Sequence, residues 1–111
     1  FEKWRDGDLR SALASAALGQ SSVAEAPLDV VIAAVFQRTE KKYGERAERY
    51  VHIEAGHAAQ NLLLQATALG LGAVTVGAFV DDQVSSVLDL PQEHAALYII
   101  PVGHPPKMAG E

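Results

Sequence analysis

The chain has 111 residues, 49% of them hydrophobic and 21% charged, a composition that indicates one folded domain over 1–111 and excludes a disordered chain. Its net charge is −5 and no basic cluster stands out, so we expect no nucleic-acid partner. It has no cysteine, which excludes disulfides, thiolate metal sites and a cysteine nucleophile. No apolar run approaches the ~18 residues of a membrane span, so we expect a cytoplasmic protein without a membrane partner.

The first elements in chain order are two short helices. Asp8 is a suitable N-cap for a helix over residues 9–18. Ser22 and Glu25 have the spacing of a capping box, which predicts a single helical turn that ends at Pro27.

A buried strand and a charged segment follow. Residues 28–36 (LDVVIAAVF) form a continuous apolar run with β-branched residues at its centre, which predicts a strand buried on both faces. Residues 37–48 are strongly charged and contain Gly44, so we expect a solvated connection that bends at this glycine.

The segment 50–69 predicts one long buried helix, because it is apolar on nearly every side. Its polar exceptions are spaced by three, four and four residues and therefore share one helix face. These exceptions are Glu54, His57, Asn61 and Gln65. A row of buried polar groups needs hydrogen-bonding partners, which another helix, a second subunit or a ligand would supply.

Gly70 is placed to close this helix, and residues 73–79 (AVTVGAF) then predict a strand. The G-x-G of this region comes after a helix and before a strand, which is the reverse of the order in a dinucleotide-binding loop. The sequence therefore does not support a Rossmann domain.

The last elements are a helix over 82–90, capped by Asp81 or Asp82, and a strand over 96–102. The order α-β-α-β-α-β predicts a mixed sheet with helices on both faces. Three strands make a small sheet that cannot cover the long helix, so a partner subunit or further N-terminal chain has to pack against it.

No metal or hydrolase motif is present. The four histidines, at positions 52, 57, 94 and 104, form no H-E-x-x-H pattern, so we predict no metal site. There is no G-x-S-x-G nucleophile elbow either. Residue chemistry alone thus identifies no active site.

Two blocks, YVHIEAGHAAQNLLLQATALGLGAVTVGAF (50–79) and ALYIIPVGHP (96–105), resemble the C-terminal half of nitroreductase-fold flavoproteins. The resemblance extends through KYGERAERYVHIEAGHAAQN and is greatest to the SagB-type dehydrogenase branch, over residues 8–105. It implies an α+β, three-layer α-β-α fold with a mixed central sheet. It also implies that residues 1–111 are the C-terminal part of a larger nitroreductase domain.

The resemblance further implies an FMN enzyme that moves hydride between a reduced nicotinamide, NAD(P)H, or an organic donor and a small-molecule or peptide acceptor. It implies a homodimer through the 50–69 helix, with FMN between the subunits. The backbone of Thr75, Val76, Gly77 and Ala78 would lie along the flavin ring and hydrogen-bond its N5 and O4 atoms. The alternative is a plain core strand with a glycine bulge.

Other site residues also come from the resemblance. Glu54 faces flavin or the dimer seam in relatives, and Lys107 is what remains of the basic residues after the last strand. The Lys42-Tyr43 pair resembles one thought to remove a proton in azoline-oxidising relatives. A solvated surface is the competing interpretation of these two residues.

Three functions remain open from the sequence. The first is an FMN oxidoreductase, either a nitro- or quinone-reducing enzyme or a peptide azoline dehydrogenase. The second is a cofactor-free dimerisation or scaffold domain of the same fold, which is favoured by the absence of the family's N-terminal phosphate-binding motif. The third is a small-ligand binding module that reuses the flavin cleft.

Overall fold

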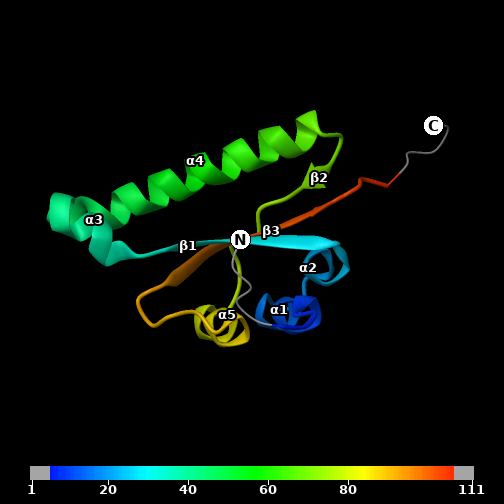
Figure 1. Cartoon of the computed structure of the whole chain (residues 1–111), viewed down its shortest axis with the longest axis horizontal. Helices are drawn as coiled ribbons and strands as arrows, with labels where there is room; N and C mark the ends of the chain where they lie inside the picture. Colours follow the sequence, from blue (N-terminus) through cyan, green and yellow to red (C-terminus); the bar gives the residue numbers. More distant parts are fainter. Residues whose placement is uncertain (1–5, 107–111) are drawn as a thin grey trace.

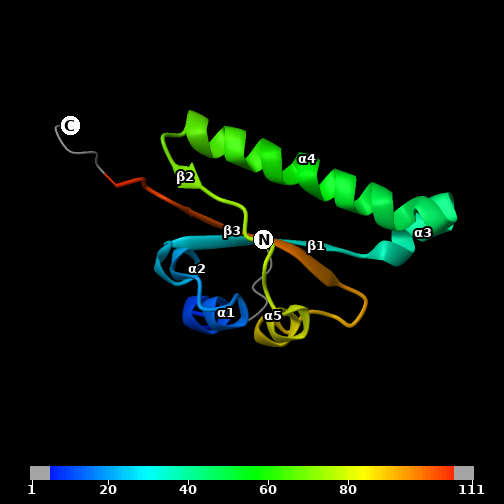
Figure 2. The same cartoon turned by 180° about the vertical axis from the view of Figure 1, so that it is seen from behind.

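The computed structural model describes residues 6–106. It has three layers, with the sheet in the middle, α3 and α4 on one face and α1, α2 and α5 on the other (Figure 1; Figure 2 from behind). The elements are α1 (Arg10–Ala16), α2 (Ser21–Glu25), β1 (Leu28–Ala34), α3 (Phe36–Tyr43), the 3-10 turn η1 (Gly44–Arg46), α4 (Ala47–Ala68), β2 (Gly72–Ala73), α5 (Asp81–Leu88) and β3 (Ala95–Gly103). The predicted α+β, three-layer class is confirmed.

The sheet has the strand order β1-β3-β2, and both pairings are antiparallel. The expectation of a mixed sheet is therefore wrong for the described strands. The connection through α3 and α4 does leave β1 and β2 pointing the same way. However, β3 lies between them and runs in the opposite direction, so no parallel pair forms.

The two faces of the sheet support two apolar cores. Ile99 and Ile100 are both fully buried, and because successive strand residues point to opposite faces, each of them anchors one core. Ile100 packs with Val102 and Ala59 beneath α4. Ile99 packs with the buried residues of α1, α2 and α5, which are Leu13, Ala14, Ala16, Val23 and Val84.

A bulge in β3 adjusts this alternation. The register of β1 on β3 shifts after Ile32, whose partner is Tyr98, to Ala33, whose partner is Ala96. Leu97 is thus an extra residue in the ladder. As a result, Ala96 lies in the same core as Ile99.

The predicted caps are only partly correct. Asp8 lies one residue before the N-cap of α1, and its carboxylate accepts a hydrogen bond from the Arg10 backbone N–H at 3.1 Å. The capping box is wrong, because α2 has Gln20 as N-cap and no side-chain cap bond. Asp81 and Asp82 lie in the first turn of α5, where the helix dipole stabilises their negative charge. Neither of them is the N-cap.

Two segments differ from the sequence expectation. Much of the charged segment 37–48 is helical, in α3 and the start of α4, and Gly44 forms the expected bend with φ of +57°. The predicted strand 73–79 is reduced to β2 and an isolated bridge between Val76 and Ile99. The segment has one partner strand among the described residues, β3, and pairs with it at Ala73 and Val76 without a continuous ladder between them.

Helix α4 is confirmed, but its burial within one chain is limited to a stripe. The stripe consists of Ala47, Val51, Ala55, Ala59 and Ala66. Outside it, Ile53 is 48% exposed and Leu64 is 59% exposed, and the polar row from Glu54 to Gln65 faces outward. Within residues 6–106, no helix is long and apolar enough to cross a membrane.

Candidate functional site

The segment after β2 forms the outer edge of the sheet beside β3. The Val76 N–H donates to the Ile99 carbonyl at 2.7 Å, and the Ile99 N–H donates back to Val76 at 3.0 Å. In an antiparallel ladder, the residues on either side of such a pair direct their N–H groups away from the partner strand. The N–H groups of Thr75 and Gly77 therefore point out from the edge, and neither has a hydrogen-bond partner among the described residues.

Core packing and one side-chain hydrogen bond anchor this edge segment to the rest of the chain. The Val76 side chain is only 5% exposed and belongs to the core around Ile99. The Ala78 carbonyl accepts a hydrogen bond from Nε2 of Gln20 at 2.9 Å. Gly77 and Ala78 are themselves exposed. The four predicted flavin-contacting residues thus form an anchored ledge (Thr75–Ala78) with free backbone donors.

Gly77 is not required by the packing of the chain itself. A Cβ added at this position would meet the ring of Tyr98 at 3.6 Å, which is ordinary van der Waals contact. The described residues therefore have room for alanine at position 77.

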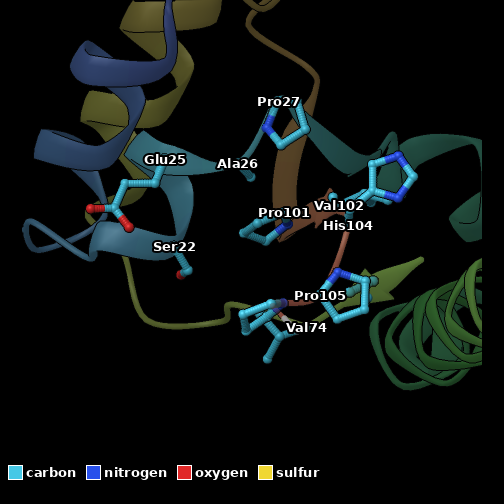
Figure 3. Close-up of a pocket in the computed structure, with 13 residues that line it drawn as sticks. Ser22, Glu25, Ala26, Pro27, Val74, Pro101, Val102, His104 and Pro105 are labelled. Carbon is cyan, nitrogen blue, oxygen red and sulfur yellow. The ribbon is translucent and has the colours of Figure 1, made fainter. Parts of the chain in front are cut away.

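A hollow of about 450 Å³ opens next to the ledge, between α2, β2 and the end of β3 (Figure 3). Its wall is built largely from the rings of Pro27, Pro101 and Pro105, with Val74 and Glu25 also at its surface. No lysine or arginine lines it among the described residues. A bound phosphate needs several charge-assisted hydrogen bonds, and this wall does not supply them. Lys107, the predicted cationic contact, lies outside the described residues.

The Lys42-Tyr43 pair is at the C-terminal end of α3, and both side chains are exposed. Lys42 Nζ lies 5.3 Å from the centroid of the Tyr43 ring, within cation–π range. The Tyr43 ring contacts the Tyr50 ring edge-to-face, with centroids 4.9 Å apart and an interplanar angle of 88°. Both tyrosines line an open hollow with Ile53, Glu54 and His57. Two predicted site residues, Tyr43 and Glu54, therefore line the same hollow.

The ledge and the Lys42-Tyr43 pair lie in different places on the chain. The pair lies at the end of α4 where α3 packs, whereas the ledge follows β2, which lies at the other end of α4 (Figure 1). With 22 residues, α4 is about 33 Å long. One copy of the chain does not bring the predicted catalytic and flavin-contacting residues together.

The sequence analysis missed one unusual residue. Asp29 lies in β1, and both of its carboxylate oxygens are buried without a hydrogen-bond partner in the described part of the chain. Burial raises its pKa to about 6, against the opposing effect of the positive charge of Arg10. The signal was a single charged residue inside the apolar run LDVVIAAVF.

A neighbouring carboxyl behaves in the opposite way. The hydrogen bond from the Arg10 side chain lowers the pKa of Asp8 to about 2, and the Asp8 charge in turn raises the pKa of Arg10. Among residues 6–106, no group of three or more histidine or acidic side chains is placed to hold a metal ion.

Comparisons with known proteins give consistent results. The model of the nitroreductase family matches residues 2–104. A protein of Methanocaldococcus jannaschii named as a candidate nitroreductase is 47% identical over 98 residues, covering 88% of this chain and 48% of that protein. The chain thus spans about half the length of this relative.

Two solved structures are similar in fold and sequence. A candidate nitroreductase of Anabaena variabilis superimposes with a TM-score of 0.84 and 36% identity, covering 92% of this chain and 21% of that one. The NADPH:FMN oxidoreductase of Vibrio harveyi, solved with NAD⁺, has a TM-score of 0.76 and 30% identity, covering 92% of this chain and 48% of that one.

Proposed function

Because the chain belongs to the nitroreductase family, we propose that it acts in an FMN-dependent oxidoreductase that moves hydride between NAD(P)H or an organic donor and an acceptor. The Vibrio harveyi relative is named as an oxidoreductase of NADPH and FMN. We further propose that residues 1–111 correspond to the C-terminal part of such a domain.

The observation that carries this proposal is the ledge at Thr75–Ala78. Its outward N–H groups at Thr75 and Gly77 are suited to hydrogen-bond the polar edge of a flavin ring. Val76 holds the ledge in register with Ile99, so the donors are oriented before any ligand arrives. FMN, when bound, supplies the hydride-accepting and hydride-donating chemistry; the ledge contributes orientation and electron-withdrawing hydrogen bonds.

The glycine at position 77 supports the same assignment. Since the chain has room for a methyl group there, its own packing does not demand a glycine. A flat ring lying against the backbone would demand one, because any side chain would stand between the ring and the N–H donors. We therefore assign the exposed side of Gly77 to the ligand.

Within the family, we propose a SagB-type enzyme. The support is the Lys42-Tyr43 pair: Lys42 Nζ lies 5.3 Å from the Tyr43 ring centroid, and Tyr43 lines an open hollow with Glu54. In this role, Lys42 takes a proton from the substrate and Tyr43 orients it. Such an enzyme would oxidise an azoline ring in a peptide.

The two halves of the site require a second copy of the chain. Lys42-Tyr43 and the ledge lie apart in one copy, and the outer side of α4 carries exposed leucine and isoleucine. We propose that α4 forms a homodimer seam and that each active site combines the ledge of one copy with the Lys42-Tyr43 pair of the other. A two-fold axis would produce two such sites.

A cofactor-free scaffold domain is the second candidate. The observation in its favour is the proline-walled hollow next to the ledge, which has no lysine or arginine among the described residues that line it. Lys107 is the remaining candidate for a phosphate contact, and one lysine is a weak grip for a dianion.

An absorbance spectrum of the purified chain, with and without added FMN, distinguishes the two candidates. We expect a flavin spectrum that persists through gel filtration after FMN is added, and a large loss of bound flavin in Gly77→Asp. Gly77→Asp places a negative side chain against the ledge, while Glu40→Gln, on the exposed surface of α3, serves as control. Flavin bound by a longer protein that contains residues 1–111, but not by this chain, would show that further chain supplies the phosphate contacts. Absence of bound flavin in both, with their folds intact, would favour the scaffold.

The proposed role of Lys42 has its own test. In Lys42→Ala we expect bound flavin to remain and turnover of an azoline peptide to fall by about 10²-fold or more, because general-base catalysis contributes that much. Lys41→Ala is the matched control, one residue away on the same helix. Equal turnover in the two variants would exclude Lys42 as the base.

A further inference from the structure

Asp29 lies on the face of β1 that packs against helices, although it is an acidic residue. Alternation along the strand directs Val30 and Ile32 to the core beneath α4 and Val31 to the core of α1 and α5. Asp29 shares the Val31 face and so points toward α1 and α5, which lie side by side below the sheet (Figures 1 and 2).

The Asp29 carboxylate has no partner there. Both oxygens are covered, and neither receives a hydrogen bond from residues 6–106. A buried carboxylate without donors costs several kcal/mol in general, and native structures rarely keep one without a functional reason. A missing cationic partner is the simplest physical explanation.

Arg10 does not fill that role, although its charge is close enough to influence Asp29. Its Nε and one terminal nitrogen donate to the two oxygens of Asp8 at 2.9 and 2.8 Å. The other terminal nitrogen donates to the Ala26 carbonyl at 2.9 Å. Three of the five guanidinium N–H groups thus have other acceptors, and no hydrogen bond joins Arg10 to Asp29.

Asp29 is one of the residues that line a hollow of about 440 Å³ between α1, the end of α5 and the start of β1. The charged groups that line it are Asp8, Arg10 and Asp29. Asp8 and Arg10 neutralise each other as an ion pair, so one negative charge remains. Most of the other lining side chains are apolar: Leu9, Leu13, Pro27, Leu28, Val31 and Leu88.

This lining selects a particular ligand chemistry. One free carboxylate can neutralise one positive charge but cannot provide the several oxygen ligands that a divalent cation requires. The leucine and valine walls favour a short hydrocarbon chain behind the charged head. We propose that this Asp29 hollow is a binding site for a small primary amine: a rotation of the Asp29 side chain brings its covered oxygens to the ammonium group, while the alkyl chain contacts the leucines.

Nuclear magnetic resonance titration of the ¹⁵N-labelled 111-residue chain with n-butylammonium chloride at pH 7.5 tests this proposal. Equal concentrations of sodium chloride correct for ionic strength. We expect saturable shifts at the amides of residues 8–13 and 28–31, and at least about tenfold weaker binding in Asp29→Asn, since a charge-assisted contact is lost. Glu40→Gln, which removes an exposed carboxylate on the other side of the sheet, should bind like the wild type.

A second probe separates charge from simple burial of hydrocarbon. n-Butanol, which has the same alkyl chain without the charge, should bind the wild type much more weakly than n-butylammonium. The proposal is overturned if n-butylammonium causes no saturable shifts, if Asp29→Asn binds it equally well, or if n-butanol matches it. A dispersed amide spectrum of Asp29→Asn establishes that the variant is folded.

Discussion

At the residue scale, two aspartates are both influenced by the charge of Arg10, but the pKa of one is lowered and that of the other is raised. Asp8 is exposed and accepts hydrogen bonds from Arg10, so its charged form is favoured. Asp29 is covered and accepts none, so its charged form is disfavoured. The difference follows from the orientation of the Arg10 guanidinium, which is directed at Asp8 near the start of α1 and not at Asp29.

The raised pKa of Asp29 predicts a pH-dependent cost to stability. The carboxyl has a pKa of about 6 in the folded chain and 3.8 as the ordinary value. As pH rises from about 4 to 6, the unfolded chain releases this proton first, so the folded state loses stability in that window and does not regain it above. Partial exposure to water reduces the penalty, and we expect about 1 kcal/mol.

Urea denaturation of Asp29→Asn against wild type measures this cost. The two should be nearly equal in stability near pH 4, and the variant should become more stable by about 1 kcal/mol above pH 6.5. Asp8→Asn is the contrasting control: Asp8 has a lowered pKa, so its contribution is present above pH 4 and lost at lower pH. A constant difference between Asp29→Asn and wild type across pH would contradict the assignment.

Two glycines should respond differently to alanine. A Cβ at Gly103 would lie 2.8 Å from Cδ of Pro27, a contact that forces the β3 end and the start of β1 apart. We expect Gly103→Ala to lower the free energy of unfolding by about 1–3 kcal/mol, as overpacking does. Gly77→Ala should change it by less than about 0.5 kcal/mol, because the added methyl fits. Similar losses for both, in the same denaturation experiment, would contradict this reasoning.

At the element scale, one copy of the chain buries only part of the apolar surface of α4. Small residues, mostly alanines four apart, form the stripe that packs on the sheet, which lets the helix lie close to it. The larger side chains of Ile53 and Leu64 lie outside that stripe and stay exposed. A surface helix normally shows the reverse arrangement, with large apolar residues inward.

The exposed side of α4 therefore predicts self-association that a single charge can weaken. Leu64→Glu should weaken dimerisation by about tenfold or more, because it places a carboxylate in the proposed apolar seam. Leu18→Glu, at an equally exposed leucine after α1, should leave association unchanged. Sedimentation equilibrium measures both, and circular dichroism establishes that α4 remains helical. Equal dimerisation of the two variants would place the seam elsewhere.

At the scale of the whole molecule, the site proposed above is divided between two copies. The ledge and the Lys42-Tyr43 pair are separated along α4 in one chain, and a two-fold axis is the simplest operation that brings one group near the other. The proposed arrangement would make dimerisation a requirement for catalysis and not only for stability.

Subunit mixing tests this division. Lys42→Ala and Gly77→Asp should each be inactive, but an unfolded and refolded equimolar mixture should recover about a quarter of wild-type activity. Half of the dimers would then be mixed, and each mixed dimer would contain one intact site of two. If both groups served a site within one copy, every site would carry a defect and the mixture would remain inactive.

The local pattern of the sequence was enough to predict those elements that depend on contacts between near neighbours in the chain, or that need only an apolar environment of any kind. Strands β1 and β3, helix α4 and the bend at Gly44 follow from runs, periodicity and one permissive glycine. The resemblance in residues 50–79 and 96–105 likewise predicted the family, because these blocks carry the contacts of the fold. The roles of Lys42, Tyr43 and the ledge remain predictions.

Tertiary structure decided what depends on a neighbour distant in sequence. β3 inserts between β1 and β2, so the sheet is antiparallel, and the segment 73–79 pairs with β3 only at Ala73 and at the isolated bridge of Val76. Asp29 looked like one charge in an apolar run, and its burial depends on α1 and α5 packing over it. Hydrophobic periodicity reports that a face is covered, but which element covers it is set by long-range packing, which no local pattern contains.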